Sequence, residues 1–227
     1  MSSAGRLAEP QVEAMFDRIA SVYDLMNSVM TAGMHQRWRE RAVDLAGTPK
    51  RALDVATGTG DLAIALRDRG AQVVGVDFAE KMLEIARQKA PGIDFRTGNA
   101  LALDFSDNEF DAATVGFGAR NFDDLDRGLS EMARVVRPGG RVVVLEITTP
   151  QRPPLSWFFK AWFDSVVPLI GRIAGDPDAY EYLPNSVKRF PEPRDLAARM
   201  VGAGMEDVRW ILTAGGIIAI HVGTVTT

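Results

Sequence analysis

Short apolar runs alternate with amphipathic stretches through the middle of the chain, and this alternation most constrains the fold. The run RALDVA (51–56) predicts a buried strand, and DLAIALRDRG (61–70) predicts a helix that ends at a glycine. The pair recurs as QVVGVD (72–77) followed by AEKMLEIARQKA (79–90). Strands that alternate with helices in this way predict a parallel sheet with helices on both of its faces.

The pattern continues toward both ends of the chain. Residues 9–46 carry apolar side chains at helical spacing, and a further helix is expected over 194–204. A helix over 124–136 precedes the last of three more strands, which are read in IDFRTGNA, FDAATVGFG and RVVVLEIT. EDVRWILTAGGIIAIHVGT predicts two closing strands joined through Gly215–Gly216.

We therefore expect one α/β domain over residues 1–227. Its core is a doubly wound, mostly parallel, seven-stranded sheet of the Rossmann-like kind, with N-terminal helices and an antiparallel hairpin at the C-terminal edge. Residues 150–192 interrupt the alternation as an irregular insertion.

Composition excludes several classes of function. The 227 residues are 46% hydrophobic and 25% charged with a net charge of −4, which gives no reason to expect nucleic-acid binding. The lack of cysteine excludes disulfides and thiolate metal sites and agrees with a cytoplasmic location. With His35 and His221 as its two histidines, the chain is expected to hold no metal. No secretory signal is recognised, and no apolar run reaches the roughly 18 residues of a membrane span.

A glycine-rich turn follows the first strand, at the place where open α/β sheets bind their ligands. Gly58, Thr59 and Gly60, with Ala63, fit the pattern G-x-G-x-x-A. Asp77 ends the second strand, where a carboxylate can accept hydrogen bonds from both hydroxyls of a ribose. NAD and S-adenosylmethionine share these features, so the turn and Asp77 leave both cofactors open.

Asp61 favours S-adenosylmethionine over NAD. It follows Gly60 at the start of the predicted helix, where a dinucleotide would place its pyrophosphate. A carboxylate would repel those phosphates, whereas S-adenosylmethionine carries an ammonium and a sulfonium and no phosphate. Asp54 adds to the same negative field. The alternative is that Asp61 only complements the helix dipole as an acid in the first turn.

Two later stretches reach the same edge of the predicted sheet. Asn99 and Ala100 end the third strand, where a backbone amide and a short polar side chain can read the edge of an adenine. Gly116 and Arg120 follow the fourth strand, with small residues that leave room for a ligand. Turn chemistry alone also explains the glycines and the Asn-Ala pair.

The chain resembles the class I S-adenosylmethionine-dependent methyltransferases in its loop, in Asp77, in Asn99–Ala100 and in the turn RPGG. Two longer stretches, YDLMNSVMTAGMHQRW (23–38) and RVVRPGGRVVVLEIT (134–148), are similar to the two signatures of the demethylmenaquinone/2-polyprenyl-benzoquinol C-methyltransferase family. The likeness extends to FGARNF, DAYEYLPNSVKRFP and LTAGGIIAIHVG and covers nearly the whole chain. Gly116, where relatives of the ubiquinone pathway often carry serine, favours the menaquinone branch.

The resemblance implies that a methyl group passes from S-adenosylmethionine to a ring carbon of a prenylated quinol, without a metal. We rank Asp61 first as the base, acting through water, with Arg120 orienting that water or stabilising the oxyanion of the quinol. His35, together with Tyr23, is the alternative contact for the quinol hydroxyls. Two other readings stay open, namely a polyprenyl-benzoquinol substrate in ubiquinone biosynthesis and a NAD-dependent oxidoreductase.

Two segments are expected to enclose the substrate. Residues 1–48 form an N-terminal helical cover, and residues 150–192 form an apolar wall or lid that includes Tyr180 and Tyr182. The stretch PPLSWFFKAWFDSVVPLIGRIAG within that insertion leaves three interpretations open: a wall for the prenyl tail, a homodimer interface, and peripheral contact with the inner face of a membrane.

Overall fold

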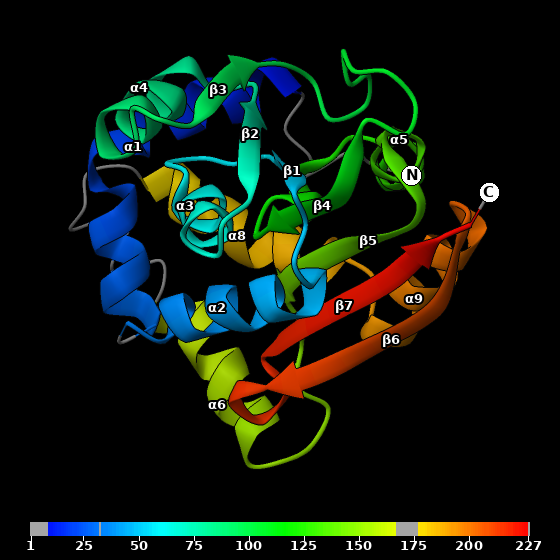
Figure 1. Ribbon diagram of the computed structural model, residues 1–227. Coiled ribbons are helices and arrows are strands. Elements are labelled where there is room, and N and C mark those ends of the chain that lie inside the picture. The colour runs from blue at the N-terminus through cyan, green and yellow to red at the C-terminus, as the bar shows by residue number, and fades with distance from the viewer. Residues whose placement is uncertain (1–8, 32, 167–176, 227) are drawn as a thin grey trace.

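The computed structural model describes residues 9–31, 33–166 and 177–226. Its centre is a seven-stranded sheet in the order β3-β2-β1-β4-β5-β7-β6 (Figure 1). The strands are β1 Arg51–Val55, β2 Gln72–Asp77, β3 Asp94–Thr97, β4 Phe110–Gly116, β5 Val136–Ile147, β6 Met205–Thr213 and β7 Ile218–Val225. The first five pair in parallel, whereas β7 is antiparallel to both β5 and β6. The expected sheet and its antiparallel C-terminal strands are therefore confirmed.

Helices cover both faces of the sheet because each presents one apolar face to it. One face is covered by α2 Met34–Ala46, α3 Asp61–Asp68 and α4 Glu80–Lys89, which share a core with the sheet. The other face is covered by α5 Leu125–Val135 and α9 Pro193–Gly202. Strand β1, whose residues after Arg51 are buried, lies between the two cores.

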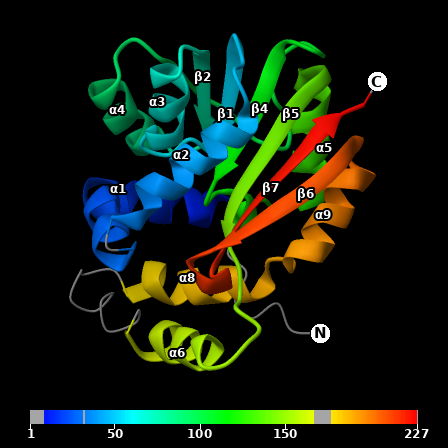
Figure 2. The same ribbon diagram turned by 60° about the horizontal axis from the view of Figure 1, so that its bottom comes forward.

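The remaining helices gather beyond the carboxyl ends of the parallel strands (Figure 2). They are α1 Glu9–Thr31, α6 Leu155–Ala161, the π-helical turn η2 Trp162–Val166 and α8 Pro177–Arg189. Because α1 and α8 contact each other as well as the central body, they cover the edge at which β1, β2 and β4 end at Val55, Asp77 and Gly116. Within the described residues no helix is both long enough and apolar enough to cross a membrane.

Two local expectations need correction. The insertion 150–192, expected to be irregular, contains α6, η2 and α8, because its apolar side chains pack on one another and on α1. Strand β3 stops at Thr97, and Asn99 pairs with Ala102 in an isolated bridge instead of extending the strand. The C-terminal hairpin lies at the edge of the sheet as expected, with β7 inside and β6 outermost.

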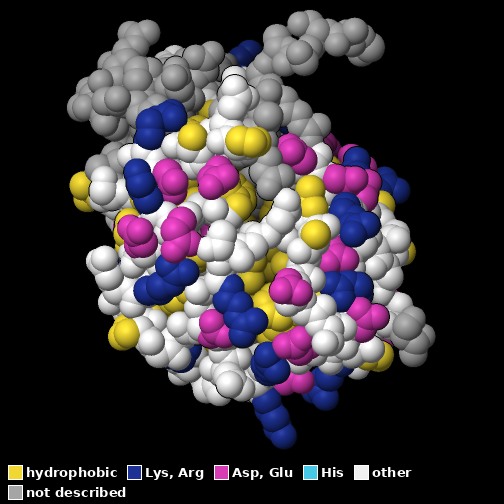
Figure 3. Space-filling model, turned by 90° about the horizontal axis from the view of Figure 1, so that it is seen from above, with side chains coloured by type: hydrophobic (Ala, Val, Ile, Leu, Met, Phe, Trp, Pro, Cys, Tyr) yellow, Lys and Arg dark blue, Asp and Glu magenta, His cyan; other side chains and the backbone are white. Residues whose placement is uncertain are grey.

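Both signs of charge are interspersed on the face seen from above. Figure 3 shows Lys and Arg side chains alternating with Asp and Glu across that face, with small apolar areas between them. Such a surface produces no extended field of one sign on the side that is visible.

Candidate active site

The loop between β1 and α3 has a backbone that requires glycine. Gly58 and Gly60 have φ values of +55° and +84°, which side chains rarely adopt. A Cβ on Gly60 would also come within 2.8 Å of the Phe95 ring. Asp77 ties this loop to the second strand, because its carboxylate accepts hydrogen bonds from Gly58 N at 2.7 Å and from Ala79 N at 2.9 Å.

Two buried carboxylates stand at the ends of neighbouring strands. Asp54 accepts hydrogen bonds from the hydroxyls of Thr57 and Thr114, at 2.6 and 2.7 Å. Burial raises the pKa of Asp54 to about 6 and that of Asp77 to about 6, although the hydrogen bonds to each carboxylate act in the opposite direction. Burial therefore makes the ionised forms of these two carboxylates costly. A ligand that brings a cation or a hydroxyl group can stabilise them.

The residues predicted to bind the cofactor line two adjoining hollows, except for Gly60, which lines neither. The first, of about 40 Å³, is lined by Gly58, Thr59, Asp61, Asp77 and Gly116, among others. The second, of about 20 Å³, is lined by Asn99 and Ala100 and shares Asp77 with the first. The side-chain oxygen of Asn99 accepts a hydrogen bond from Leu101 N at 2.7 Å, so it serves the turn as well as the hollow.

Asp61 belongs to an ionic network that joins four helices. Its Oδ1 accepts a hydrogen bond from Lys89 Nζ, and its Oδ2 lies 3.3 Å from Arg39 Nη2. Lys89 also bonds Asp24 Oδ2 at 2.9 Å, and Thr59 donates to Asp24 Oδ1 at 2.6 Å. Asp61 thus lines the hollow of about 40 Å³, with a cationic side chain at each of its carboxylate oxygens. It does not line the larger cavity described next.

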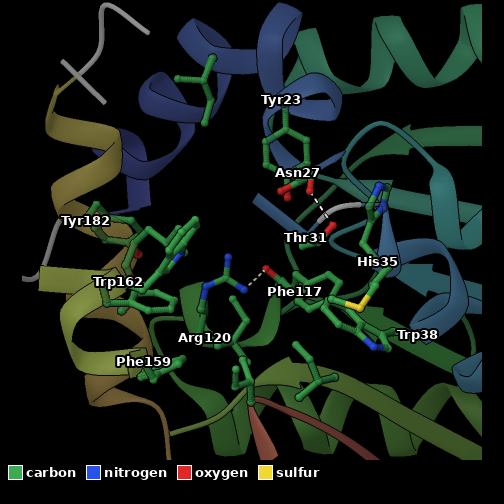
Figure 4. A pocket seen from close by; sticks show the side chains of 18 of the residues that line it. Tyr23, Asn27, Thr31, His35, Trp38, Phe117, Arg120, Phe159, Trp162 and Tyr182 are labelled. Atoms are coloured by element: carbon green, nitrogen blue, oxygen red, sulfur yellow. Dashed lines mark hydrogen bonds between the residues drawn. The ribbon is translucent and has the colours of Figure 1, made fainter. Parts of the chain in front are cut away.

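A cavity of about 320 Å³ adjoins the hollow of about 40 Å³, which we call the cofactor hollow (Figure 4). The two share Phe16, Tyr23, Arg39 and Phe117. Most of the cavity wall is apolar, and it is built largely by α1, α6, η2 and α8. The apolar side chains from these elements are Met15, Phe16, Ile19, Phe158, Phe159, Trp162, Phe163, Tyr182 and Leu183. The side chain of Tyr180 lies outside the described part of the structure.

Arg120 supplies a buried positive charge to this cavity, and Figure 4 shows its guanidinium pointing into it. Arg120 Nη1 donates to both carboxylate oxygens of Glu146, at 2.9 and 3.2 Å, and to Phe117 O. Glu146 is 1% exposed and also accepts the backbone N–H of Arg120. Arg120 Nε is buried and has no hydrogen-bond partner among the described residues.

His35 lies between two side chains that occupy both of its ring nitrogens. Ser28 donates its own hydroxyl to Asp24 O at 2.9 Å, so Ser28 Oγ can only accept from His35 Nε2, which lies 3.2 Å away. Nδ1 then accepts from Arg39 Nη1. Burial and the neighbouring Arg39 lower the pKa of His35, which agrees with a neutral ring. This arrangement suits a residue that orients Arg39 better than it suits a base.

Sequence reasoning did not single out three of these functional side chains. Glu146 reads as one polar residue inside a strand, Arg39 as part of a polar helix face, and Lys89 as a basic residue in the last turn of a helix. A signal existed for Glu146 alone, because a lone acid in the apolar run RVVVLEI must find a buried partner. No group of three or more His, Cys, Asp or Glu that could hold a metal occurs in the described ranges.

Comparison with known proteins decides the family. The model of the ubiE/COQ5 methyltransferase family matches residues 5–225. The chain belongs to the ubiE/COQ5 methyltransferase family. This methyltransferase takes its methyl group from S-adenosylmethionine, and the alternative of a NAD-dependent oxidoreductase has no support.

Relatives within and beyond the family agree with this assignment. The demethylmenaquinone methyltransferase of Thermus thermophilus is 50% identical over 92% of this chain and 99% of its own. That of Deinococcus radiodurans is 46% identical over 93% and 91%. The crystal structure of a SAM-dependent methyltransferase from Thermotoga maritima superposes with a TM-score of 0.68 at 22% identity, covering 93% of this chain and 98% of that one. The last likeness concerns the fold alone.

Binding of the cofactor is expected to weaken in mild acid. Burial raises the pKa of Asp77 to about 6, and the ionised carboxylate is the form predicted to accept both ribose hydroxyls. Affinity for S-adenosylhomocysteine should therefore be constant above about pH 7 and fall roughly tenfold per pH unit below 6. Calorimetric titration between pH 5 and 8 measures this dependence. In Asp77→Asn, which does not titrate, the part of the slope due to Asp77 should vanish. An unchanged slope would contradict the assignment.

Proposed function

We propose that this enzyme methylates a ring carbon of demethylmenaquinol to give menaquinol. The observation that carries the proposal is the apolar cavity with a buried arginine that meets the cofactor hollow at Tyr23, Arg39 and Phe117. A quinol ring at that meeting point would face the methyl donor, and its prenyl tail would need an apolar wall. The names of the Thermus and Deinococcus relatives support the naphthoquinol over the benzoquinol.

The residues of the cofactor hollows can hold S-adenosylmethionine along their length. Asn99 and Ala100 suit the adenine, Asp77 suits the ribose, and the loop from Gly58 to Asp61 suits the sulfonium end. The chemistry that the bound cofactor supplies is an electrophilic methyl group, whose bond to sulfur breaks as the new carbon–carbon bond forms. The ring carbon then loses its proton, so that the aromatic ring is restored.

Arg120 has the position and charge to stabilise the quinol oxygen as its proton leaves. Its guanidinium is held by Glu146 and Phe117 O and points into the cavity (Figure 4). A fixed donor in a water-poor cavity stabilises a developing oxyanion without reorganising during the reaction. An ionised oxygen in turn makes the ring carbon nucleophilic. The base role predicted for Asp61 stays a prediction, and the pairing of Asp61 with Lys89 and Arg39 favours contact with the cofactor instead.

The N-terminal cover and the insertion would together hold the prenyl tail. From α1, Met15, Phe16 and Ile19 line the cavity, and Phe159 and Trp162 face it from α6 and η2. Burial of each methylene of the tail contributes about 0.8 kcal/mol. Trp157 and Phe158 are 70% and 59% exposed beside this wall, which supports peripheral contact with a membrane that carries the substrate. That location, like a homodimer, stays a prediction.

The proposal is tested by transfer of a labelled methyl group to reduced substrates compared side by side. We expect labelled menaquinol from demethylmenaquinol, with a kcat/KM at least roughly tenfold above that for a polyprenyl-benzoquinol, since only the first fills the ring site. A demethylnaphthoquinol without a tail should keep the site of methylation but show a raised KM. Label in the benzoquinol alone would place the enzyme in the ubiquinone branch.

A further inference from the structure

Arg39 is buried where the cofactor hollow and the larger cavity meet, and it has no part in the chemistry described above. It lies on α2, is 8% exposed, and lines both spaces. We propose that Arg39 and Asp61 form a receptor for the amino-acid end of S-adenosylmethionine, in which Arg39 binds the carboxylate and Asp61 binds the ammonium. This inference rests on the proposed function in so far as S-adenosylmethionine is the donor.

The order of the strands fixes which end of the cofactor reaches Arg39. Asn99 follows β3 and Asp77 ends β2, so a ligand with its adenine near the first and its ribose at the second runs toward β1 and β4. The amino-acid end then arrives over the loop after β1. Arg39 and Asp61 line the hollow there, whereas neither lines the hollow beside Asn99.

The pair is complementary to a zwitterion. Arg39 Nη2 and Asp61 Oδ2 lie 3.3 Å apart. The guanidinium is opposite in charge to the carboxylate of an amino acid, and the Asp61 carboxylate is opposite in charge to its ammonium. A ligand that inserts its ammonium and its carboxylate replaces the Arg39–Asp61 ion pair with two ion pairs, one to each residue. The net charge of this buried site does not change. Lys89 stays on the other oxygen of Asp61, so the carboxylate keeps a partner throughout.

The guanidinium is held in position before the ligand arrives. His35 Nδ1 accepts from Arg39 Nη1, and Ser28 fixes the other nitrogen of the same ring. The ring of Phe117 lies 5.6 Å from the guanidinium carbon, as a cation–π contact requires. Arg39 Nη2 is thereby directed toward Asp61. A rigid, charge-assisted donor of this kind discriminates between ligands with and without a carboxylate.

The test compares three ligands, of which the first two differ only by the carboxylate, whereas the third lacks the whole amino-acid end and the sulfonium charge. S-adenosylmethionine carries both groups, decarboxylated S-adenosylmethionine keeps the amine alone, and methylthioadenosine has neither. We expect Arg39→Gln to weaken S-adenosylmethionine about 10- to 100-fold and to change the affinity for the decarboxylated ligand by less than about threefold. Asp61→Asn should weaken both amine-bearing ligands and leave methylthioadenosine within about threefold. Calorimetry measures all nine affinities, and thermal unfolding shows whether each variant is folded.

The pattern across ligands separates the outcomes. An equal loss for all three ligands in Arg39→Gln would mean that Arg39 only supports the fold, and the inference would be overturned. It would also be overturned by unchanged affinity for S-adenosylmethionine with a raised KM for the quinol, because Arg39 would then serve the other substrate. If the wild-type protein bound none of the three ligands, the proposed methyl donor itself would be wrong.

Discussion

Replacing Arg120 with methionine and Glu146 with glutamine in one variant is expected to lower kcat by roughly 10²- to 10³-fold, the usual cost of losing an oxyanion donor. The double variant tests the role of Arg120 better than Arg120→Met alone does. Arg120→Met alone would leave the Glu146 carboxylate buried and unpaired, and such a charge typically destabilises a protein by about 3–5 kcal/mol. Single-turnover rates of methyl transfer at saturating concentrations of both substrates measure the effect.

Two further variants show whether Arg120 acts on the transition state. Arg120→Lys keeps the charge and loses the forked geometry, so an intermediate rate is expected. Glu146→Gln alone leaves the guanidinium in place but less firmly held, and it should reduce kcat less than the double variant. Calorimetry should give affinities for S-adenosylhomocysteine within about threefold of wild type for all of them. If kcat were retained and only the KM for the quinol rose, Arg120 would bind the substrate without assisting its ionisation.

Asp77→Ala is expected to weaken binding of S-adenosylmethionine by about 1.5–3 kcal/mol, roughly 10- to 150-fold. Two losses combine in this variant: the contact to the ribose and the anchor that holds Gly58 N and Ala79 N. The fold should survive, because Asp77 ends its strand at the rim of the hollow rather than inside either hydrophobic core. Calorimetry on the folded variant gives the affinity.

Asp77→Asn is the matched control for Asp77→Ala. The amide keeps one acceptor and nearly the same volume, so it should retain more affinity than alanine does. Wild-type affinity in a folded Asp77→Ala protein would remove Asp77 from the cofactor site. The melting temperature without ligand shows how much of any loss comes from the loop rather than from the ribose.

The parts of the site that sequence reasoning located are those encoded by neighbours in the chain. The turn from Gly58 to Gly60 follows its strand directly, and Asp77 is placed by the end of the next strand, so parallel pairing alone brings them together. The alternation of strands and helices likewise predicts the parallel pairing of these strands, with helices on both faces of the sheet. Local patterns suffice for these features because each depends on the period of a single element.

The parts that were missed depend on contacts between distant elements. Glu146 meets Arg120 only because β5 lies beside β4, and the predicted role of Arg120 gave no indication of that partner. Arg39 reaches Asp61 because α2 crosses the amino end of α3, which no local pattern encodes. His35, predicted as an alternative contact for the quinol, lines the larger cavity with both ring nitrogens paired, and its role stays a prediction. A sequence gives the residue type of such groups and leaves their partners undetermined.

Helix α1 lies across the space that the cofactor must fill, and this position affects the timing of the reaction. Asp24 on α1 bonds Thr59 and Lys89, and Phe16 lines both the cofactor hollow and the larger cavity. The hollow of about 40 Å³ is far below the 300 Å³ or more of a typical small-molecule site, so we expect α1 to move outward when the cofactor enters. The same movement opens the wall of the larger cavity. Departure of the spent cofactor and exchange of the quinol therefore share a single opening event, and we expect its rate, rather than methyl transfer, to limit turnover.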